Sequence, residues 1–306
     1  YHRALTQMPW YRDLDLERRG ARYIEPELNV ALLTRDGEAL EWWTDFEKTC
    51  GSIARFSRRD AATARRWRDA FEPIVERILT PEAQAPPLPP DQRRALLARS
   101  AAGRLLLDTS QLSPREFVLR EFEHPVVQAG LLFFNGLREV DLREKGFGHH
   151  IPALLASKNK AQMCRGGSAQ LARALVDAIE EAGGDILLAT EPTQILVEGD
   201  RAVGVETRDG QRLKARHFVA SSLNPQQTFL DLLPPEVLPQ AWRDKAAAFR
   251  YNLLAPLFGL YLELEEAPMH RAAEAYPHLK QAFMVILGLD SPANFDAMLH
   301  HHKAGS

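Results

Sequence analysis

The sequence predicts a mixed α/β protein, because segments with helical and with strand character alternate along a chain of ordinary globular composition. Hydrophobic residues make up 45% of its 306 residues and charged residues 26%, which argues against collagen-like repeats, coiled-coil filaments and wholesale disorder. Apolar residues recur at three- and four-residue steps over residues 45–79 and 91–138, as they do in helices that bury one face. Elsewhere, short apolar runs flank Asp-Gly and Gly-Asp pairs, which are typical of hairpin turns.

The first part of the chain predicts a hairpin followed by helices. Two extended runs over residues 28–43 flank an Asp-Gly pair at positions 36 and 37, which accepts the positive φ angles of a type I′ turn. Residues 45–79 then predict a helix in two pieces, with Ser57 and Asp60 as caps. The arginines of this segment interleave with acidic residues, so we expect a solvated helix face rather than a nucleic-acid site.

The helical pattern continues after a proline run. Residues 86–90 contain four prolines, which lack the N–H that a helix or a central strand needs, so we expect a stiff connector. A new helix starts at Ser113, since Pro114 suits the first turn and Glu116 completes a capping box. The apolar residues of 117–137 predict a largely buried helical layer.

The segment 165–233 has the most specific pattern in the chain. A Gly-Gly-Ser turn at 166–168 precedes a helix over 169–182, which Gly-Gly at 183 and 184 ends. The order that follows is a strand over 186–189, a three-stranded meander over 193–214 and a strand over 217–220. Beyond it we expect helix over 225–249 with two proline breaks, strands over 257–265 and 283–289 in a separate sheet, and helix over 290–300.

Charge and cysteine content argue against several classes of partner. Lys and Arg number 38 against 41 Asp and Glu, so no overall field attracts nucleic acid or an anionic membrane. The two cysteines, Cys50 and Cys164, form no zinc motif or disulfide framework, and a reducing compartment fits them. Adjacent histidines at 149–150 and 300–302 have no acid or cysteine at ligand spacing, so we expect no metal site.

Residues 1–22 contain neither a signal-peptide core nor an apolar run long enough to cross a bilayer. We therefore expect no transmembrane segment, while peripheral contact with a membrane stays open. High Ala and Arg usage favours a bacterial cytoplasmic protein. The chain starts at Tyr1 rather than Met, so we expect that its N-terminus is missing, and a mitochondrial-type location also stays open.

A family resemblance rests on the ordered motifs of the segment 165–230. The Gly-Gly loop is followed by Pro-Thr-Gln-Ile at 192–195, Ala-Val-Gly-Val at 202–205, Asp-Gly at 209–210 and Ser-Ser-Leu-Asn-Pro-Gln-Gln-Thr-Phe at 221–229. In this order the motifs resemble those of the phytoene-desaturase-like FAD-dependent oxidoreductases. Within that family the chain looks closest to the pyridine nucleotide-disulfide oxidoreductase domain-containing protein 2 group.

The resemblance implies FAD as the cofactor and a set of residues near it. Gly166 and Gly167 are candidates for a loop beside a cofactor phosphate, with a plain turn before a helix as the alternative. Pro192 and Thr193 stand where the family's backbone lies against the adenine. The family usually has valine in place of Pro192, and because proline has no N–H, only its carbonyl remains for such a contact.

The resemblance extends to a second cofactor loop and to the substrate. Ser221 and Ser222 stand where the family's loop approaches the ribose and pyrophosphate, and the family usually has asparagine in place of Ser222. Gln170 is a candidate substrate-facing residue, by likeness to the Gly-Gly-Ser-x-Gln of amine oxidases. Tyr261, on a strand expected late in the chain, is a candidate for lining an apolar substrate cavity, with ordinary core packing as the alternative.

The resemblance also implies a divided domain organisation. The chain contains no G-x-G-x-x-G, which holds the FAD pyrophosphate in this family, and the resemblance places that motif upstream of residue 1. We expect residues 165–224 to be a partial FAD-binding Rossmann half with a β-meander. Residues 1–164 and 225–306 are then two parts of a helical and mixed-sheet substrate domain, the first a helical cap and the second truncated.

The function that the resemblance implies is an FAD-dependent oxidoreductase with dehydrogenase- or desaturase-like hydride transfer. We expect a mostly apolar small-molecule substrate, and we expect the 306-residue chain by itself to bind FAD weakly or not at all and to be inactive. The spacing supports no Ser-His-acid set or carboxylate pair, so no catalytic residue is predicted, and flavin chemistry needs none. Two alternatives stay open: a non-catalytic regulatory module that binds a protein partner, and a lipid or carotenoid carrier.

Overall fold

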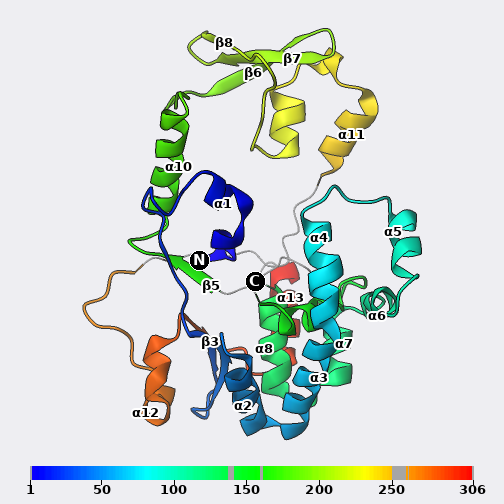
Figure 1. Ribbon diagram of the computed structural model, residues 1–306, viewed down its shortest axis with the longest axis vertical. Coiled ribbons are helices and arrows are strands. Elements are labelled where there is room, and N and C mark those ends of the chain that lie inside the picture. The colour runs from blue at the N-terminus through cyan, green and yellow to red at the C-terminus, as the bar shows by residue number, and fades with distance from the viewer. Residues whose placement is uncertain (1, 137–140, 159–160, 250–259, 261, 305–306) are drawn as a thin grey trace. The chain divides into compact units, whose positions relative to one another are not determined.

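The structure, a computed structural model, describes residues 2–136, 141–158, 161–249, 260 and 262–304, and confirms a mixed α/β fold (Figure 1). The chain divides into two compact units, one comprising Tyr1–Leu175 with Asn252–Ser306 and the other Val176–Tyr251. Among the described residues, three three-stranded sheets accompany the helices. The domain boundaries expected after residues 164 and 224 stay predictions.

The main sheet of the first unit has the strand order β4-β3-β9. Strands β3 (Leu28–Leu33) and β4 (Ala39–Trp43) form an antiparallel hairpin, and β9 (Met284–Leu287) pairs parallel to β3. The turn residue Gly37 has φ +91°, in the left-handed region that favours glycine. The predicted hairpin and the predicted strand over 283–289 are both confirmed.

Helices pack on one face of this sheet and bury a shared core with it. Leu40 of the sheet belongs to the same buried cluster as Phe71, Phe117 and Leu132 from three different helices. A Cβ on Gly130 would lie 2.8 Å from Leu40 Cδ2, so glycine lets one of these helices, α8, approach the sheet closely. Apart from the helices described below, the helices of this unit that follow the hairpin are α2 (Phe46–Phe56), α3 (Arg58–Ile74), the π-helix η2 (Val75–Leu79), α4 (Thr80–Ala83), α5 (Pro90–Leu97), α6 (Ala101–Ser110), α7 (Pro114–Glu121), α8 (Pro125–Gly136), α9 (His150–Leu155) and α13 (Pro292–Ala304).

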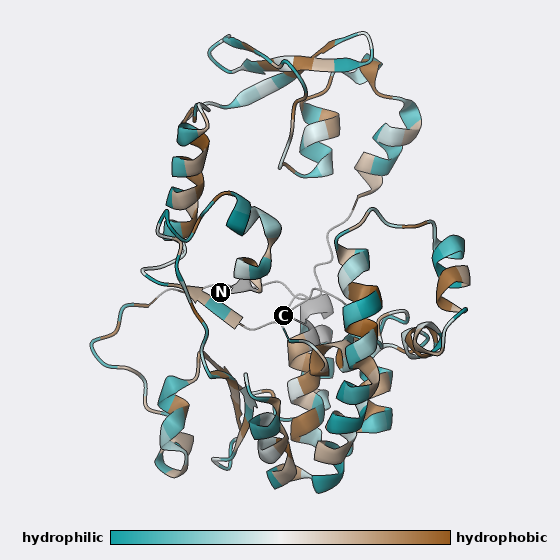
Figure 2. Cartoon of the chain, in the orientation of Figure 1, coloured by the Kyte–Doolittle hydropathy of each residue, from teal (hydrophilic) through white to brown (hydrophobic). Residues whose placement is uncertain are grey.

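The buried helical layer predicted over 117–137 is confirmed for its described residues and consists of the end of α7 together with α8. Figure 2 shows α8 in the hydrophobic colour over most of its length. The predicted helices over 45–79 and 290–300 and the proline connector before α5 are also confirmed.

Two of the three predicted caps are confirmed. Ser57 accepts a hydrogen bond from the Asp60 N–H at 3.0 Å, and Ser113 forms the full capping box with Glu116. The prediction for Asp60 is wrong. Its carboxylate is fully buried and accepts hydrogen bonds from the backbone N–H groups of Glu123 and His124, each at 2.9 Å. Asp60 therefore ties the start of α3 to the junction of α7 and α8 instead of capping its own helix.

The opposite face of the main sheet is covered by two short helices near the end of the chain, α12 (Ala272–Ala275) and the 3-10 helix η5 (Pro277–Gln281). Ala272 and Leu279 pack there with Leu28, Ala31 and Leu33 of β3. Segments that are distant in sequence therefore cover the two faces of the hairpin.

A second small sheet of the first unit has the order β1-β5-β2 and was not predicted. β5 (Ala161–Cys164) pairs antiparallel with β1 (His2–Arg3) on one side and β2 (Tyr23–Ile24) on the other. The 3-10 helix η1 (Leu5–Gln7) and helix α1 (Pro9–Asp13) connect the two outer strands. Gln162 of β5 is buried and donates hydrogen bonds to Thr6 Oγ1 and Glu25 Oε1, at 2.7 Å and 2.9 Å.

The second unit contains the predicted meander. Strands β6 (Pro192–Glu198), β7 (Arg201–Thr207) and β8 (Arg212–Lys214) form an antiparallel sheet in that order. Helix α10 (Ala169–Glu181) precedes the meander and crosses the boundary between the units in sequence. The predicted helical stretch over 225–249 is confirmed as the π-helix η3 (Gln227–Asp231), the 3-10 helix η4 (Pro235–Val237) and α11 (Gln240–Ala248).

The strands predicted on either side of the meander are wrong: residues 186–189 and 217–220 form no strand. A strand must pair its backbone N–H and C=O groups with a neighbour, and no described strand pairs with either run. Their apolar side chains are correspondingly exposed, Leu188 at 85% and Phe218 at 75%. Four of the nine residues of the strand expected over 257–265 lie outside the described residues, and its described members, 260 and 262–265, form no strand.

None of the described helices has both the length and the apolar character required to cross a membrane.

Candidate functional site

The Gly-Gly loop connects β5 to α10. Gly166 and Gly167 have φ +79° and +92°, so both occupy the left-handed region, in which a side chain is strained. The Gly167 N–H donates to the Cys164 carbonyl at 3.0 Å and closes a turn at the end of β5. The loop therefore leads directly into the N-terminus of a 13-residue helix, where backbone N–H groups and the helix dipole favour an anion.

The two glycines have different surroundings. A Cβ on Gly166 would lie 3.3 Å from Gln170 Nε2, so the structure brings Gly166 and the predicted substrate residue Gln170 together. A Cβ on Gly167 would meet nothing within 4 Å, which leaves its backbone open to close approach by another molecule. Cys164, beside the loop, is buried. The pKa of Tyr23 is raised, mainly because Tyr23 is itself shielded from solvent and in addition because it contacts Cys164.

The remaining predicted cofactor residues belong to the second unit. Pro192 is the first residue of β6, where a missing N–H is tolerated, and it stands opposite Thr207 of β7. Thr193 donates its hydroxyl to the Glu206 carbonyl at 3.2 Å. Pro192 and Thr193 are both exposed.

Ser221 and Ser222 lie on the exposed loop before η3. The Ser221 hydroxyl is 2.8 Å from Thr228 Oγ1 and accepts a hydrogen bond from the Leu223 N–H at 3.3 Å, so local contacts fix its position. Tyr261 lies outside the described residues. Gly166, Gly167 and Gln170 thus belong to the first unit, and Pro192, Thr193, Ser221 and Ser222 belong to the second.

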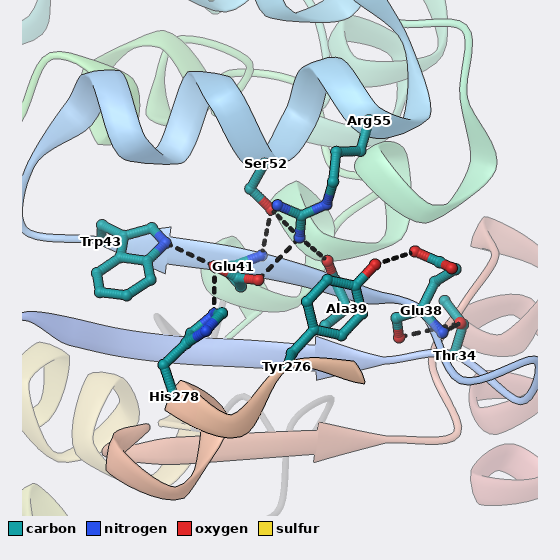
Figure 3. A network of polar contacts seen from close by, with 9 residues as sticks. All are labelled: Thr34, Glu38, Ala39, Glu41, Trp43, Ser52, Arg55, Tyr276 and His278. Carbon is teal, nitrogen blue, oxygen red and sulfur yellow. Dashed lines mark hydrogen bonds and ion pairs between the residues drawn. The ribbon is translucent and has the colours of Figure 1, made fainter. Parts of the chain in front are cut away.

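A buried glutamate, which the sequence did not reveal, organises the main sheet of the first unit (Figure 3). Glu41 of β4 is only 3% exposed. Its Oε1 accepts a hydrogen bond from Arg55 of α2 at 2.8 Å, and its Oε2 accepts one from the Trp43 indole N–H at 2.8 Å. His278 Nε2 of η5 lies 3.1 Å from Oε2, a distance that makes an ion pair when the imidazole is protonated, although the angles do not make a hydrogen bond.

The same network extends along the hairpin. Arg55 also donates to the Ala39 carbonyl at 2.7 Å, and its guanidinium lies 5.1 Å from the centre of the Tyr276 ring. The Tyr276 hydroxyl donates to Glu38 at 2.5 Å, and this bond raises the pKa of Tyr276. Figure 3 shows Arg55 reaching Glu41 from the helix above the hairpin, while His278 reaches Glu41 and Tyr276 reaches Glu38 from the segment below it.

The chemistry of this network is structural. Every oxygen of the Glu41 carboxylate has a partner, and its charge is paired with Arg55 inside the fold. A buried pair of this kind destabilises the fold strongly when one partner is removed, because the other charge is left unpaired. The only signal in the sequence is that Glu41 lies two positions from both Ala39 and Trp43, so that it shares one face of a strand with these apolar residues.

No group of three or more His, Cys, Asp or Glu side chains within the described ranges is arranged to hold a metal ion.

Comparison with known proteins found no matching family model, but it found curated relatives over nearly the whole chain. A subunit of limonene dehydrogenase from Castellaniella defragrans is 29% identical over 99% of this chain and 56% of its own length. The pyridine nucleotide-disulfide oxidoreductase domain-containing protein 2 of Mus musculus is 26% identical over 87% of this chain, and that of Rattus norvegicus 25% over 90%.

The similarity to the domain-containing protein 2 group, predicted from the motifs over 165–230, is confirmed, while the link to phytoene desaturases stays a prediction. The chain spans about half the length of the curated relatives that it matches. The names of these relatives contain the words dehydrogenase and oxidoreductase.

Proposed function

We propose that this chain is part of a flavin-dependent oxidoreductase that transfers hydride to or from a mostly apolar small molecule. The observation that carries the proposal is the ordered segment from the Gly-Gly loop through α10 to the meander β6-β7-β8. Relatives whose names include dehydrogenase and oxidoreductase match this chain over 87% to 99% of its length, which supports the same class.

FAD is the cofactor that we propose, and the Gly-Gly loop fits an anionic group of its kind. Gly167 has no side chain, open space beside it and a long helix directly after it, the arrangement that suits a phosphate. Gly166 in turn leaves room for the Gln170 side chain, which we propose to orient the substrate. The Pro192 carbonyl, Thr193 and the loop at Ser221 and Ser222 would hold other parts of the cofactor.

A bound flavin supplies the hydride-accepting ring, so this chain contributes binding, orientation and exclusion of water. The proposal assigns no protein nucleophile.

The test uses the full-length protein that contains this chain. After addition of FAD and removal of unbound cofactor, we expect the visible absorbance of a bound flavin and its bleaching by a suitable reduced substrate. A full-length protein that shows no flavin absorbance under these conditions contradicts the proposal.

A matched pair of glycine variants tests the role of the loop. Gly167→Ala places a Cβ in the open space of the loop and is expected to lower the flavin content of the purified protein. Gly37→Ala is the control, because Gly37 has nearly the same φ, +91° against +92°, and equally open surroundings in the hairpin turn. Equal flavin loss in both variants contradicts a cofactor role for Gly167.

A second candidate is an interaction module within a larger assembly. The name of one relative describes it as a subunit, and the second unit exposes the apolar side chains of Leu187, Leu188 and Phe218. Light scattering on the full-length protein separates the two candidates when combined with the flavin assay: a stable complex with no flavin favours the module.

A further inference from the structure

A pocket of about 340 Å³ lies in the first unit, at the end of the hairpin where β4 leads into α2. Its volume is within the range of sites for small molecules. None of its lining residues belongs to the Gly-Gly loop or to the meander. The residues that line it are Asn29, Trp42, Trp43, Thr44, Phe46, Arg68, Leu154, Leu155, Ala156, Ser157 and Lys158.

A β-bulge shapes one wall of this pocket. Leu28 and Val30 pair with the consecutive residues Trp43 and Trp42, so Asn29 is the extra residue of β3. Asn29 donates from Nδ2 to Thr44 Oγ1 at 3.0 Å, which fastens the bulge to the residue that follows β4. Bulges are found next to binding sites because they redirect side chains, and this one brings both tryptophans to the pocket.

Aromatic side chains contribute flat, apolar surfaces to a lining that also contains polar and charged residues. Trp42, Trp43 and Phe46 are only partly buried, although large aromatic side chains are usually covered in a folded protein. Trp42 is held by a ring contact with Phe134, with centroids 4.9 Å apart, and Trp43 by its hydrogen bond to Glu41. Both rings are therefore fixed before any ligand arrives.

The charges on the wall are positive. Among the described residues, the lining includes two cations and no carboxylate. The charge of Lys158 is already paired, because its ammonium group lies 2.6 Å from a carboxylate oxygen of both Glu72 and Glu76. These bonds favour the protonated form and raise the pKa of Lys158. Arg68 differs, since no carboxylate of the described residues lies within ion-pair distance of it, and its charge acts on Glu72 of the same helix only through space.

Arg68 is also held in place. Its guanidinium stacks over the Phe46 ring with its central carbon 4.4 Å from the ring centre. The attraction between the guanidinium and the ring face leaves the N–H groups of Arg68 available, and these match the two oxygens of a carboxylate.

From this arrangement we propose that the pocket binds a small carboxylic acid with a flat apolar body. The carboxylate lies on the guanidinium of Arg68, and the body lies against Trp42, which packs on the same side of the sheet as Phe46. The proposal does not depend on a flavin, because no pocket residue is one that we assign to the cofactor.

Isothermal titration calorimetry of the full chain with phenylacetate tests the proposal. We expect saturable binding of one molecule per chain. Phenylacetamide, a neutral compound of nearly the same shape, should bind about tenfold more weakly or worse, because it offers no charge to Arg68.

Variants of two arginines on α3 locate the site. Arg68→Gln should weaken phenylacetate binding about tenfold or more, and Arg68→Lys should have an intermediate effect, because lysine keeps the charge but not the planar fork. Arg58→Gln is the matched control, since Arg58 is exposed on the same helix and does not line the pocket. Thermal unfolding of each variant checks that the fold is retained.

Three outcomes overturn the proposal. They are the absence of saturable phenylacetate binding to the unmodified chain, equal affinity for phenylacetate and phenylacetamide, and equal weakening by the substitutions at Arg58 and Arg68. None of them bears on whether the full-length protein binds flavin.

Discussion

Two buried carboxylates connect different elements of the first unit. Asp60 accepts hydrogen bonds from the backbone of Glu123 and His124, and Glu41 accepts them from Arg55 and Trp43. Ionised carboxylates are rarely buried unless donors surround them, and here each oxygen has at least one donor. Such carboxylates stabilise the fold because their hydrogen bonds form only when the elements that carry the donors are packed in the native arrangement.

Replacing Asp60 by alanine is expected to lower the free energy of unfolding by about 3 kcal/mol. The substitution leaves two backbone N–H groups without an acceptor at the junction of α7 and α8. Urea denaturation measures the change. Asp69→Ala, at an exposed position of the same helix, is the control and should change the free energy by less than about 0.5 kcal/mol. Equal effects of the two substitutions contradict the assigned role.

Helices α3 and α7 are fastened to each other by Glu121. Its carboxylate accepts hydrogen bonds from the Trp67 indole at 2.8 Å, from Arg66 at 2.9 Å and from Arg120 at 3.0 Å. Burial alone raises the pKa of Glu121, but the three hydrogen bonds together outweigh burial and hold the pKa below its ordinary value. The Trp67 ring packs on Phe117, with centroids 4.9 Å apart, so polar and apolar contacts reinforce the same pair of helices.

The lowered pKa of Glu121 predicts a dependence of stability on pH. The unfolded chain binds this proton more tightly than the folded chain, so the stabilisation is fully present above the ordinary glutamate pKa of about 4.3. It is lost as the pH falls through the lower pKa of the folded state. Glu121→Gln should therefore be less stable than the unmodified chain at neutral pH, and the difference should shrink in acid below about pH 4.3.

Urea denaturation at a series of pH values measures this difference. The control is Glu144→Gln, which removes an exposed charge in a loop of the same unit. If the difference between the Glu121→Gln variant and the unmodified chain stays constant from neutral pH into acid, the assigned hydrogen bonds do not depend on ionised Glu121.

The two compact units differ in how much apolar surface they bury. Among the described residues, the first unit contains two core clusters, one between helices and sheet and the other beneath α12. Of the described residues in the second unit, the buried apolar side chains are Ala178, Ile195 and Ala246. Since burial of apolar surface is the main stabilising contribution, the second unit has little to offset the entropy of ordering its chain.

Hydrogen exchange measured by mass spectrometry on the intact chain should reveal this difference. We expect amides of β6, β7 and β8 to exchange well before those of α3 and α8, because opening of the second unit exposes little apolar surface. Equal protection in the meander and in the α3–α8 core contradicts the expectation.

Local chemistry explains which elements the sequence predicted well. The hairpin turn, the Ser113 capping box and the helix that begins after the Gly-Gly loop each depend on residues close together in the chain. The predictions of strands over 186–189 and 217–220 are wrong because an apolar run indicates only that a segment can form a strand. It does not indicate that a neighbouring strand exists for it to pair with. The small sheet around β5 was missed for the opposite reason, since its outer strands have two residues each and are far from β5 in sequence.

The amino-acid sequence was sufficient to establish the mixed α/β class, most helices, the meander and the ordered motifs that led to the oxidoreductase relatives. The environment of Glu41 and the pocket beside Arg68 emerged only from tertiary packing. Tyr276 meets Glu38 across 238 positions of the chain, and Phe46 meets the guanidinium of Arg68 from a different helix. Helix and turn signals arise within a few residues, whereas a buried charge network or a pocket wall exists only after distant segments have packed together.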